Sequence, residues 1–130
     1  IAAAQRITRQ RQTAVLHTLG VDDFARQRLS RYTPGMRQRL QMALVLLLDR
    51  PLNLLDEPLD DVDPASLSTI CDAISQLGRA GKTVIVSTGQ PDKLVAVTNT
   101  LFVLTKQQIV EVSGSGIDDL TTATDQSFLN

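Results

Sequence analysis

The strongest hydrophobic pattern in this 130-residue chain is a helical stripe near its middle. Apolar residues from Leu67 to Leu77 recur three or four positions apart, which is the spacing of one helix face. Asp63 and Pro64 precede the stripe as a capping residue and a first-turn proline. Gly78 and Gly81 follow it and favour an end to the helix. The pattern therefore predicts a helix from about residue 64 to residue 78.

Short apolar runs at residues 52–56 and 83–87 flank this helix. Their length, and the β-branched residues of the second run, favour strands. Two strands joined through a helix by short links are expected to lie parallel, with a right-handed crossover. The first run suits a strand covered on both faces, yet two strands alone would leave several side chains poorly covered, namely Leu52, Leu54, Val84 and Val86. We therefore expect further strands from another segment.

Three helices are expected before the first strand. Residues 2–19 lack glycine and proline and predict a helix with an irregular start that stops at Gly20. Acidic residues at its start favour a short helix over residues 22–28. Thr33 is a suitable cap for a third helix, over residues 34–48, which is strongly apolar in its second half.

The pattern after the second strand is less regular. A proline is expected to begin a short helix over residues 91–97. Residues 101–104 and 109–112 predict two strands joined by a polar turn. Residues 113–130 are rich in Gly, Ser, Thr and Asp, which predicts a weakly ordered tail with one helical turn near residues 117–120.

Composition favours an α/β domain with an aliphatic core. Hydrophobic residues make up 42% of the chain, but it contains no Trp, one Tyr and three Phe, which disfavours an aromatic-rich β sandwich. The lone cysteine, Cys71, excludes an internal disulfide framework and a cysteine-based metal site. The longest apolar stretch, residues 43–48, is too short to cross a bilayer. A membrane role would therefore require a partner.

Charge is unevenly distributed along the chain. Residues 1–50 contain nine arginines against three aspartates, whereas residues 51–130 contain four basic and eleven acidic residues. A basic half could contact nucleic acid. Its arginines, however, alternate with Gln and Leu at helical spacing and include neither a basic block nor aromatic residues for base stacking. We therefore favour a solvated helix face and expect no nucleic-acid partner.

Two adjacent carboxylates end the first predicted strand. Asp56 and Glu57 follow the apolar run directly, so they would emerge at its carboxyl end, where open α/β sheets place their ligands. One carboxylate can hold Mg²⁺ through water while its neighbour orients or deprotonates an attacking water. The simpler alternative is a strand followed by an acidic turn.

Four segments carry a resemblance to a known family: Tyr-Thr-Pro-Gly-Met-Arg-Gln-Arg-Leu at residues 32–40, and residues 52–58, 59–64 and 83–88. Together they resemble the C-terminal half of an ABC-transporter ATPase domain. The first is similar to the family's signature motif and the helix after it. The second is similar to its Walker B strand with the catalytic Glu, the third to its D-loop, and the fourth to the strand before its switch histidine. Residues 35–40 look most like the drug-export and related ABC-2-type branch.

The resemblance covers about residues 5–112 and implies an α/β fold. It is that of a partial P-loop NTPase (ABC ATPase) core, in which parallel strands are flanked by helices. Residues 1–50 would form part of the α-helical subdomain with the signature motif. Residues 51–112 would form the C-terminal half of the RecA-like ATPase core and end in a β-hairpin, and residues 113–130 would be the tail.

The resemblance also implies roles for the acidic residues. Asp56 would hold Mg²⁺ through water, and Glu57 would be the catalytic residue that polarises the attacking water. Asp63 would line the interface of a dimer. Asp60 and Asp61 depart from the small residues usual in the D-loop, and they either add negative charge near the triphosphate or form a solvated acidic turn. The implied cofactors are ATP and Mg²⁺.

The signature-like segment implies that Thr33, Gly35 and Met36 contact phosphate. A helix N-terminus offers unpaired N–H groups and a partial positive charge to an anion. In the family this motif contacts the γ-phosphate of ATP held by the opposite subunit, so the resemblance implies a head-to-tail dimer. Tyr32, Pro34 and Met36 replace the usual Leu, Gly and Gln, and the proline removes one donor. A well-capped amphipathic helix is the simpler alternative.

Two departures from the family bear on activity. The switch histidine position falls on Gly89, which has no side chain to contact the γ-phosphate, and Gln90 could replace it only with a shifted backbone. His17, the one histidine, lies in the first predicted helix. There is also no Gly-x-x-x-x-Gly-Lys-Ser/Thr segment, the Walker A loop that grips the β- and γ-phosphates. Because the chain begins with Ile1, we expect a missing N-terminal half, or a second ABC subunit, to supply that loop.

Three interpretations remain open. The chain is the C-terminal portion of an ABC-transporter ATP-binding subunit whose Mg-ATP hydrolysis powers transport, with export favoured; it would be inactive alone and would dock to a transmembrane permease on the cytoplasmic face of the membrane. Alternatively, it is a catalytically degenerate partner that lends Thr33 and Gly35 to another subunit's ATP. The third interpretation is a DNA-binding domain or a chromosome-maintenance ATPase head, although residues 1–30 lack the sustained heptads of the latter.

Overall fold

The computed structural model describes residues 7–104, 106 and 108–112. The chain divides into two compact units, between Gly89 and Gln90. The first unit contains α1 (Arg9–Thr18), a 3₁₀ helix (Leu29–Arg31), α2 (Pro34–Leu48), β1 (Leu52–Asp56), α3 (Pro64–Arg79) and β2 (Thr83–Ser87). The second contains two 3₁₀ helices (Pro91–Lys93 and Val95–Val97), β3 (Leu101–Leu104) and β4 (Ile109–Val112).

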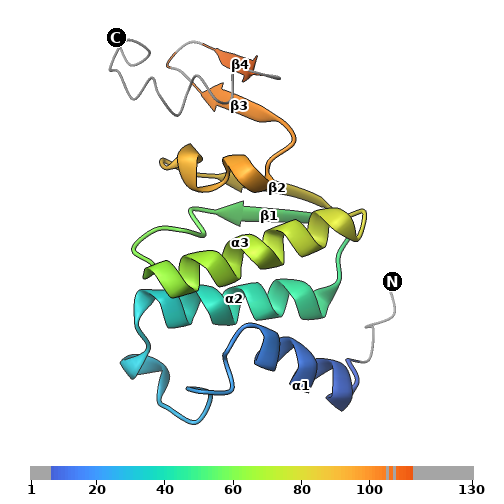
Figure 1. Cartoon of the computed structure of the whole chain (residues 1–130), viewed down its shortest axis with the longest axis vertical. Coiled ribbons are helices and arrows are strands. Elements are labelled where there is room, and N and C mark those ends of the chain that lie inside the picture. Colours follow the sequence, from blue (N-terminus) through green and yellow to red (C-terminus); the bar gives the residue numbers. More distant parts are fainter. Residues whose placement is uncertain (1–6, 105, 107, 113–130) are drawn as a thin grey trace. The chain divides into compact units, whose positions relative to one another are not determined.

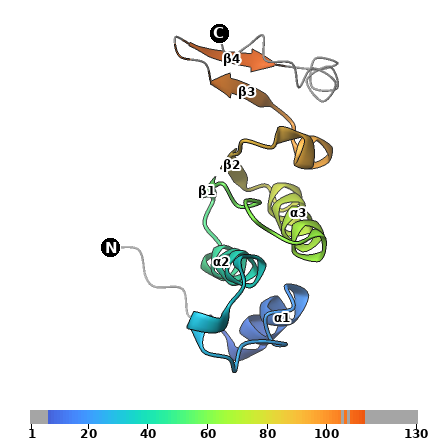
Figure 2. The ribbon, with the colours of Figure 1, turned by 90° about the vertical axis from the view of Figure 1, so that its left-hand side faces the viewer.

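In the first unit, three helices stack on one another and on a two-stranded sheet (Figure 1). β1 and β2 are parallel, and their register pairs Leu52 with Thr83 and Asp56 with Ser87. α3 connects the two strands and packs against both β2 and α2, while α2 packs against α1. Figure 2 views α2 and α3 nearly along their axes, side by side. The predicted strand, helix, strand unit with parallel strands is therefore confirmed.

Both long helices begin where the sequence predicts. The hydroxyl of Thr33 accepts a hydrogen bond from the N–H of Met36 at 3.2 Å and so caps α2. The carboxylate of Asp63 accepts one from the N–H of Ser66 at 2.9 Å and so caps α3. In each helix a proline follows the cap, where its fixed φ suits the helix and its missing N–H has no intrahelical partner to lose. Local chemistry thus fixes both starting points.

The core of the first unit is aliphatic, with an aromatic pair beside it. The buried residues of α2 and α3 include Met42, Ala43, Leu46, Leu47, Ile70, Ala73, Ile74 and Leu77. The rings of Phe24 and Tyr32 lie edge to face, with centroids 4.9 Å apart, and the Tyr32 hydroxyl donates to the Phe24 carbonyl at 3.3 Å. The guanidinium of Arg39 lies 5.0 Å from the centroid of the Phe24 ring. These contacts fix the chain immediately before α2.

The two faces of the β1–β2 sheet differ in how far they are covered. Successive side chains of a strand alternate between faces. The face toward α3 carries side chains that are buried or half-buried, namely Asn53, Leu55, Val84 and Val86. The opposite face carries Leu52, Leu54 and Ile85, which are 52%, 71% and 56% exposed.

The expectation that two strands alone would leave four side chains poorly covered is confirmed for two of them. Leu52 and Leu54 are poorly covered, as two strands alone require. Val84 and Val86 are half-buried because they share the α3 side of the sheet. The further strands that we expect to cover the opposite face are not among the described residues, so that expectation stays a prediction.

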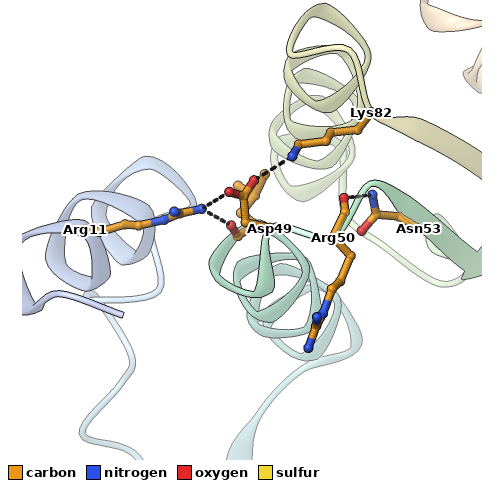
Figure 3. A network of polar contacts seen from close by, with 6 residues as sticks. Arg11, Asp49, Arg50, Asn53 and Lys82 are labelled. Carbon is orange, nitrogen blue, oxygen red and sulfur yellow. Dashed lines mark hydrogen bonds and ion pairs between the residues drawn. The ribbon is translucent and has the colours of Figure 1, made fainter. Parts of the chain in front are cut away.

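An ion-pair network joins three segments of the first unit (Figure 3). Asp49, at the C-terminal end of α2, adopts the left-handed conformation with φ of 51°. Its carboxylate accepts from Nζ of Lys82 at 3.1 Å and lies 3.5 Å from Nη2 of Arg11. The same Arg11 nitrogen donates to the carbonyl of Leu46 at 2.9 Å. Asp49 thereby ties α1 and the loop before β2 to the end of α2.

The helix expected over residues 22–28 is wrong. Residues 22–27 form turns, and a 3₁₀ helix follows at Leu29–Arg31. Asp22, the expected cap, instead pairs backward with Nδ1 of His17 at 2.9 Å. The N–H groups of Phe24 and Gln27 bond to carbonyls three residues earlier, which closes turns in place of an α-helix.

The remaining differences are small. α1 begins at Arg9 because Thr8 caps it, its hydroxyl oxygen accepting from the N–H of Arg11. Residues 1–6 of the expected helix lie outside the described part, and α3 passes through Gly78 to Arg79. Residues 91–97 form two 3₁₀ helices in place of one helix. β3 and β4 pair antiparallel, which confirms the predicted hairpin. The expected tail over residues 113–130, with its helical turn, lies outside the described residues. None of the described helices combines the length and apolarity needed to span a bilayer.

Candidate functional site

The carboxyl end of β1 carries the predicted acid pair. Asp56 is the last residue of the strand and Glu57 begins the turn after it, and both are exposed. Glu57 has φ of 43°, in the left-handed region that residues other than glycine rarely adopt. Its Oε2 accepts a hydrogen bond from the backbone N–H of Gly89 at 3.2 Å. The predicted catalytic residue therefore contacts the residue at the predicted switch position through that residue's backbone.

Ser87, the last residue of β2, contacts both acids. Its hydroxyl donates to Oδ1 of Asp56. The N–H of Glu57 donates to the Ser87 carbonyl at 3.0 Å and lies 3.3 Å from the Ser87 hydroxyl oxygen. The sequence pattern did not single out Ser87 as a site residue. The sequence feature that could have identified Ser87 is the equal length of the two predicted strands. Parallel strands of equal length that start together also end side by side, which places Ser87 beside Asp56.

Gln38 is a second contact that the sequence did not reveal. It lies on α2, and its Nε2 donates to the carbonyl of Glu57 at 3.4 Å. The signature-like helix thus contacts the acidic turn after β1. The two residues are 19 positions apart and belong to different elements, so no local spacing pointed to the pair.

The N-terminus of α2 packs closely against the N-terminus of α3. A Cβ atom placed on Gly35 would lie 2.6 Å from Oγ of Ser66 and would also overlap the carboxylate of Asp63. Gly35 and Ser66 are both buried. The group that lies close to Gly35, as expected at this position, is therefore the first turn of α3 in this chain. Thr33, which is exposed, uses its hydroxyl oxygen to accept from the N–H of Met36.

Asp63 is held by the first turn of α3. Its Oδ1 accepts from the N–H of Ser66 at 2.9 Å, and its Oδ2 accepts from the Ser66 hydroxyl at 2.7 Å. The hydroxyl bond first, and then the N–H bond, lower the pKa of the Asp63 carboxyl below its ordinary value. The carboxylate is therefore charged at neutral pH, and it is exposed at the surface of the unit.

The predicted site residues fall into two groups within the first unit. Asp56, Glu57 and Gly89 lie at the carboxyl end of the sheet, where hydrogen bonds join them to one another or to their neighbour Ser87. The second group surrounds the N-termini of α2 and α3 and contains Thr33, Gly35, Met36 and Asp63. Gln90 begins the second unit.

His17 belongs to neither group. It lies near the C-terminal end of α1 and is exposed, and the hydrogen bond with Asp22 raises the pKa of its imidazole. It is a surface side chain paired with Asp22, apart from the predicted site residues.

The carboxylates at the end of β1 suit a Mg²⁺ ion that is held mainly by water and by phosphate oxygens. Among the described residues no group of three or more His, Cys, Asp or Glu side chains gathers to form a metal cage. Mg²⁺ commonly uses one or two carboxylates, several waters and the oxygens of a bound phosphate. The exposed carboxylate of Asp56, at the end of a strand, fits that mode of binding.

Known proteins similar to this chain share one description. The family profile described as "ABC transporter" matches residues 2–60. The ABC transporter ATP-binding protein YhcH of Bacillus subtilis is 31% identical over 107 residues, which are 82% of this chain and 35% of that protein. The phosphonates import ATP-binding protein PhnC 2 of Pseudomonas savastanoi is 34% identical, over 73% of this chain and 35% of that protein. The daunorubicin/doxorubicin resistance ATP-binding protein DrrA of Streptomyces peucetius is 28% identical, over 83% and 33%.

Solved structures agree in fold. The ADP conformation of MJ1267, an ATP-binding cassette of an ABC transporter, superposes with a TM-score of 0.72 at 18% identity, over 88% of this chain and 46% of that one. A putative metal-chelate type ABC transporter in an inward-facing conformation gives a TM-score of 0.67 at 26% identity, over 80% and 42%. The fold is therefore that of a P-loop NTPase cassette, α/β with parallel strands and flanking helices. The chain spans about a third of the length of these curated relatives.

Proposed function

The chain belongs to the ATP-binding domains of ABC transporters, and we propose from that premise that it contributes the hydrolytic half of a transport-coupled Mg-ATPase. The observation that carries the proposal is the acid pair at the end of β1, where Asp56 and Glu57 are exposed and contact the end of β2. In this role Asp56 holds Mg²⁺ through water. Glu57 accepts the proton of, or orients, the water that attacks the γ-phosphate.

The signature-like segment supplies the second part of the proposal. The N-terminus of α2 presents a partial positive charge, and Thr33 and Gly35 lie at it. We assign this surface, together with Met36, to the γ-phosphate of ATP held by an opposing subunit in a head-to-tail dimer. Asp63, exposed beside Gly35, lines the dimer interface.

Two partners are required for this activity. The sequence contains no Walker A loop, so another segment of the protein, or a second ABC subunit, supplies it. A transmembrane permease couples hydrolysis to transport and holds the subunit on the cytoplasmic face of the membrane. The 130-residue chain alone is expected to show no steady ATP turnover.

Export is the finer part of the proposal. The Gly-Met-Arg-Gln-Arg-Leu sequence of residues 35–40 supports it, and so does the similarity to a drug-resistance protein. Phosphonate import proteins are similar to a comparable degree. Substrate uptake, measured in vesicles that contain the full transporter, would contradict the export assignment.

The substitution Glu57→Gln in the full-length protein tests the hydrolytic role. It keeps an oxygen that can accept the Gly89 N–H but removes the base, so ATP turnover should fall by about 100-fold or more while ATP binding persists. Glu111→Gln, the same change at an exposed residue of β4, is the matched control and should leave turnover unchanged.

A second candidate function is a non-hydrolysing partner that completes another subunit's ATP site. Gly89 offers no side chain at the switch position, and Pro34 lacks the N–H of the usual glycine. Under this alternative, wild-type turnover would be no faster than that of Glu57→Gln, although the wild-type protein would still raise the turnover of its ABC partner.

A further inference from the structure

The hydroxyl group of Ser87 contacts both members of the acid pair. It donates to Oδ1 of Asp56, and its oxygen lies 3.3 Å from the N–H of Glu57. The parallel register explains the contact with Asp56, because it pairs these two residues across the ends of β1 and β2. Both residues are exposed, so the contact is made at the surface where a ligand would bind.

A single accepted hydrogen bond restricts a carboxylate in a specific way. With Oδ1 held by the hydroxyl, the Asp56 side chain loses its free rotation, and the second oxygen points in a fixed direction. Residues that hold a metal-binding group in this manner commonly affect metal affinity although they never contact the metal. Since the sheet pairs through its backbone, the hydroxyl is not needed for strand pairing.

The same hydroxyl borders the turn that carries Glu57. This residue has positive φ, and its N–H is shared between the carbonyl and the hydroxyl oxygen of Ser87. The N–H of Gly89, two residues after Ser87, donates to the Glu57 carboxylate. The end of β2 and the residues directly after it therefore hold both acids, through Ser87 and Gly89.

We propose that Ser87 is a positioning residue that orients Asp56 toward Mg²⁺ and keeps Glu57 in its left-handed turn. This inference rests on the proposed function of the acid pair. It assigns no chemical step to Ser87, which acts only through the two carboxylates. Its effect should therefore appear in the dependence of the reaction on Mg²⁺.

The test compares four forms of the full-length protein: wild type, Ser87→Ala, Ser87→Thr and Thr83→Ala. Ser87→Ala removes the hydroxyl, and Ser87→Thr restores it in a residue that suits a strand. Thr83 is exposed at the start of β2, on the same face as Ser87, so Thr83→Ala is the matched control. The measurement is the Mg²⁺ concentration that gives half-maximal ATP turnover, with the melting temperature recorded for each protein.

Ser87→Ala should raise the half-saturating Mg²⁺ concentration by about 10-fold. Ser87→Thr should restore it, Thr83→Ala should leave it at the wild-type value, and the melting temperature should stay constant because Ser87 is exposed. An unchanged Mg²⁺ dependence in Ser87→Ala overturns the inference. So does a change that the threonine variant does not reverse, or one that Thr83→Ala reproduces.

Failure of the proposed function would give a different experimental result. If wild type binds ATP without turnover, the same four proteins are compared by Mn²⁺ binding to the ATP-bound form, where the same weakening and rescue are expected. If wild type binds no ATP, the proposed function fails and this inference fails with it. If the wild-type protein hydrolyses ATP and Ser87→Ala has the same Mg²⁺ dependence, only the role of Ser87 is refuted. The proposed function then stands.

Discussion

Ser66 fills the space beside Gly35 that any larger residue at that position would need. A Cβ at Gly35 would lie 2.6 Å from Oγ of Ser66, and Ser66 is fully buried and bonded to Asp63. The N-termini of α2 and α3 are therefore in contact through a glycine and a serine. In the proposed function these are the signature segment and the helix after the D-loop, so the two motifs are held together within one subunit.

Substitution of Gly35 by Ala should destabilise the protein. The added methyl group cannot be accommodated without movement of α3, and overpacking of this kind costs about 1–3 kcal/mol of the free energy of unfolding. The measurement is the denaturant midpoint of the full-length protein. The control is Gly78→Ala, where an added Cβ meets nothing within 4 Å inside α3 and should stabilise by about 0.5–1 kcal/mol. Equal midpoints for the two variants would contradict the packing role of Gly35.

Substitution of Asp49 by Asn should loosen the network of Figure 3 and change the pH dependence of stability. Lys82 and then Arg11 lower the pKa of the Asp49 carboxyl in the folded protein. The Asp49 carboxyl has a lower pKa in the folded protein than in the unfolded chain, where an Asp pKa is about 3.9. Its ionised form therefore stabilises the fold at pH values above the unfolded pKa, and this stabilisation is lost as the pH falls through the folded pKa. Asn also tolerates the left-handed conformation, so the backbone is preserved.

The check is the difference in urea midpoint between wild type and Asp49→Asn. It should be present at pH 7 and should shrink as the pH falls below about 4. Asp72→Asn, at an exposed position of α3, should show no such difference at either pH. A difference for Asp49→Asn that is independent of pH would argue against an ion-pair origin.

Substitution of Gly89 by His should increase ATP turnover. A Cβ at Gly89 would lie 3.9 Å from Oε1 of Glu57, which is an ordinary contact, so the position accepts a side chain. In the proposed active site the imidazole would add the donor to the γ-phosphate that glycine lacks, and turnover should rise by about 10-fold or more.

The matched control at this position is Gly89→Ala. It retains the N–H that holds Glu57 and adds no donor, so its turnover should equal that of wild type. If the histidine variant is no faster than the alanine variant, the missing switch side chain does not limit hydrolysis.

Local signals predicted the elements well. Thr33 and Asp63 cap α2 and α3 as expected, because a side-chain oxygen followed by proline is a self-contained start signal. The prediction for residues 22–28 failed because the Asp22 carboxylate could cap the segment after it or pair with His17 before it. In the structure it pairs with His17. Sequence alone does not rank such competing partners.

Contacts between elements were harder to predict. The acid pair followed from its place at the end of a strand, but its neighbours Ser87 and Gln38 depend on strand register and helix packing. Likewise, a glycine in a signature-like motif indicates that another group lies close to the backbone there. The sequence does not identify that group. In this fold the space beside Gly35 is taken by Ser66 of the same chain.

The uncovered face of the β1–β2 sheet has a consequence for how the protein can be produced. Leu52, Leu54 and Ile85 project from it, and within the described residues each strand has one unpaired edge. Flat apolar strands with open edges are templates for aggregation and targets for chaperones during synthesis. We therefore propose coexpression with the further strands expected to cover this face, in place of refolding the chain alone, as the route to soluble material.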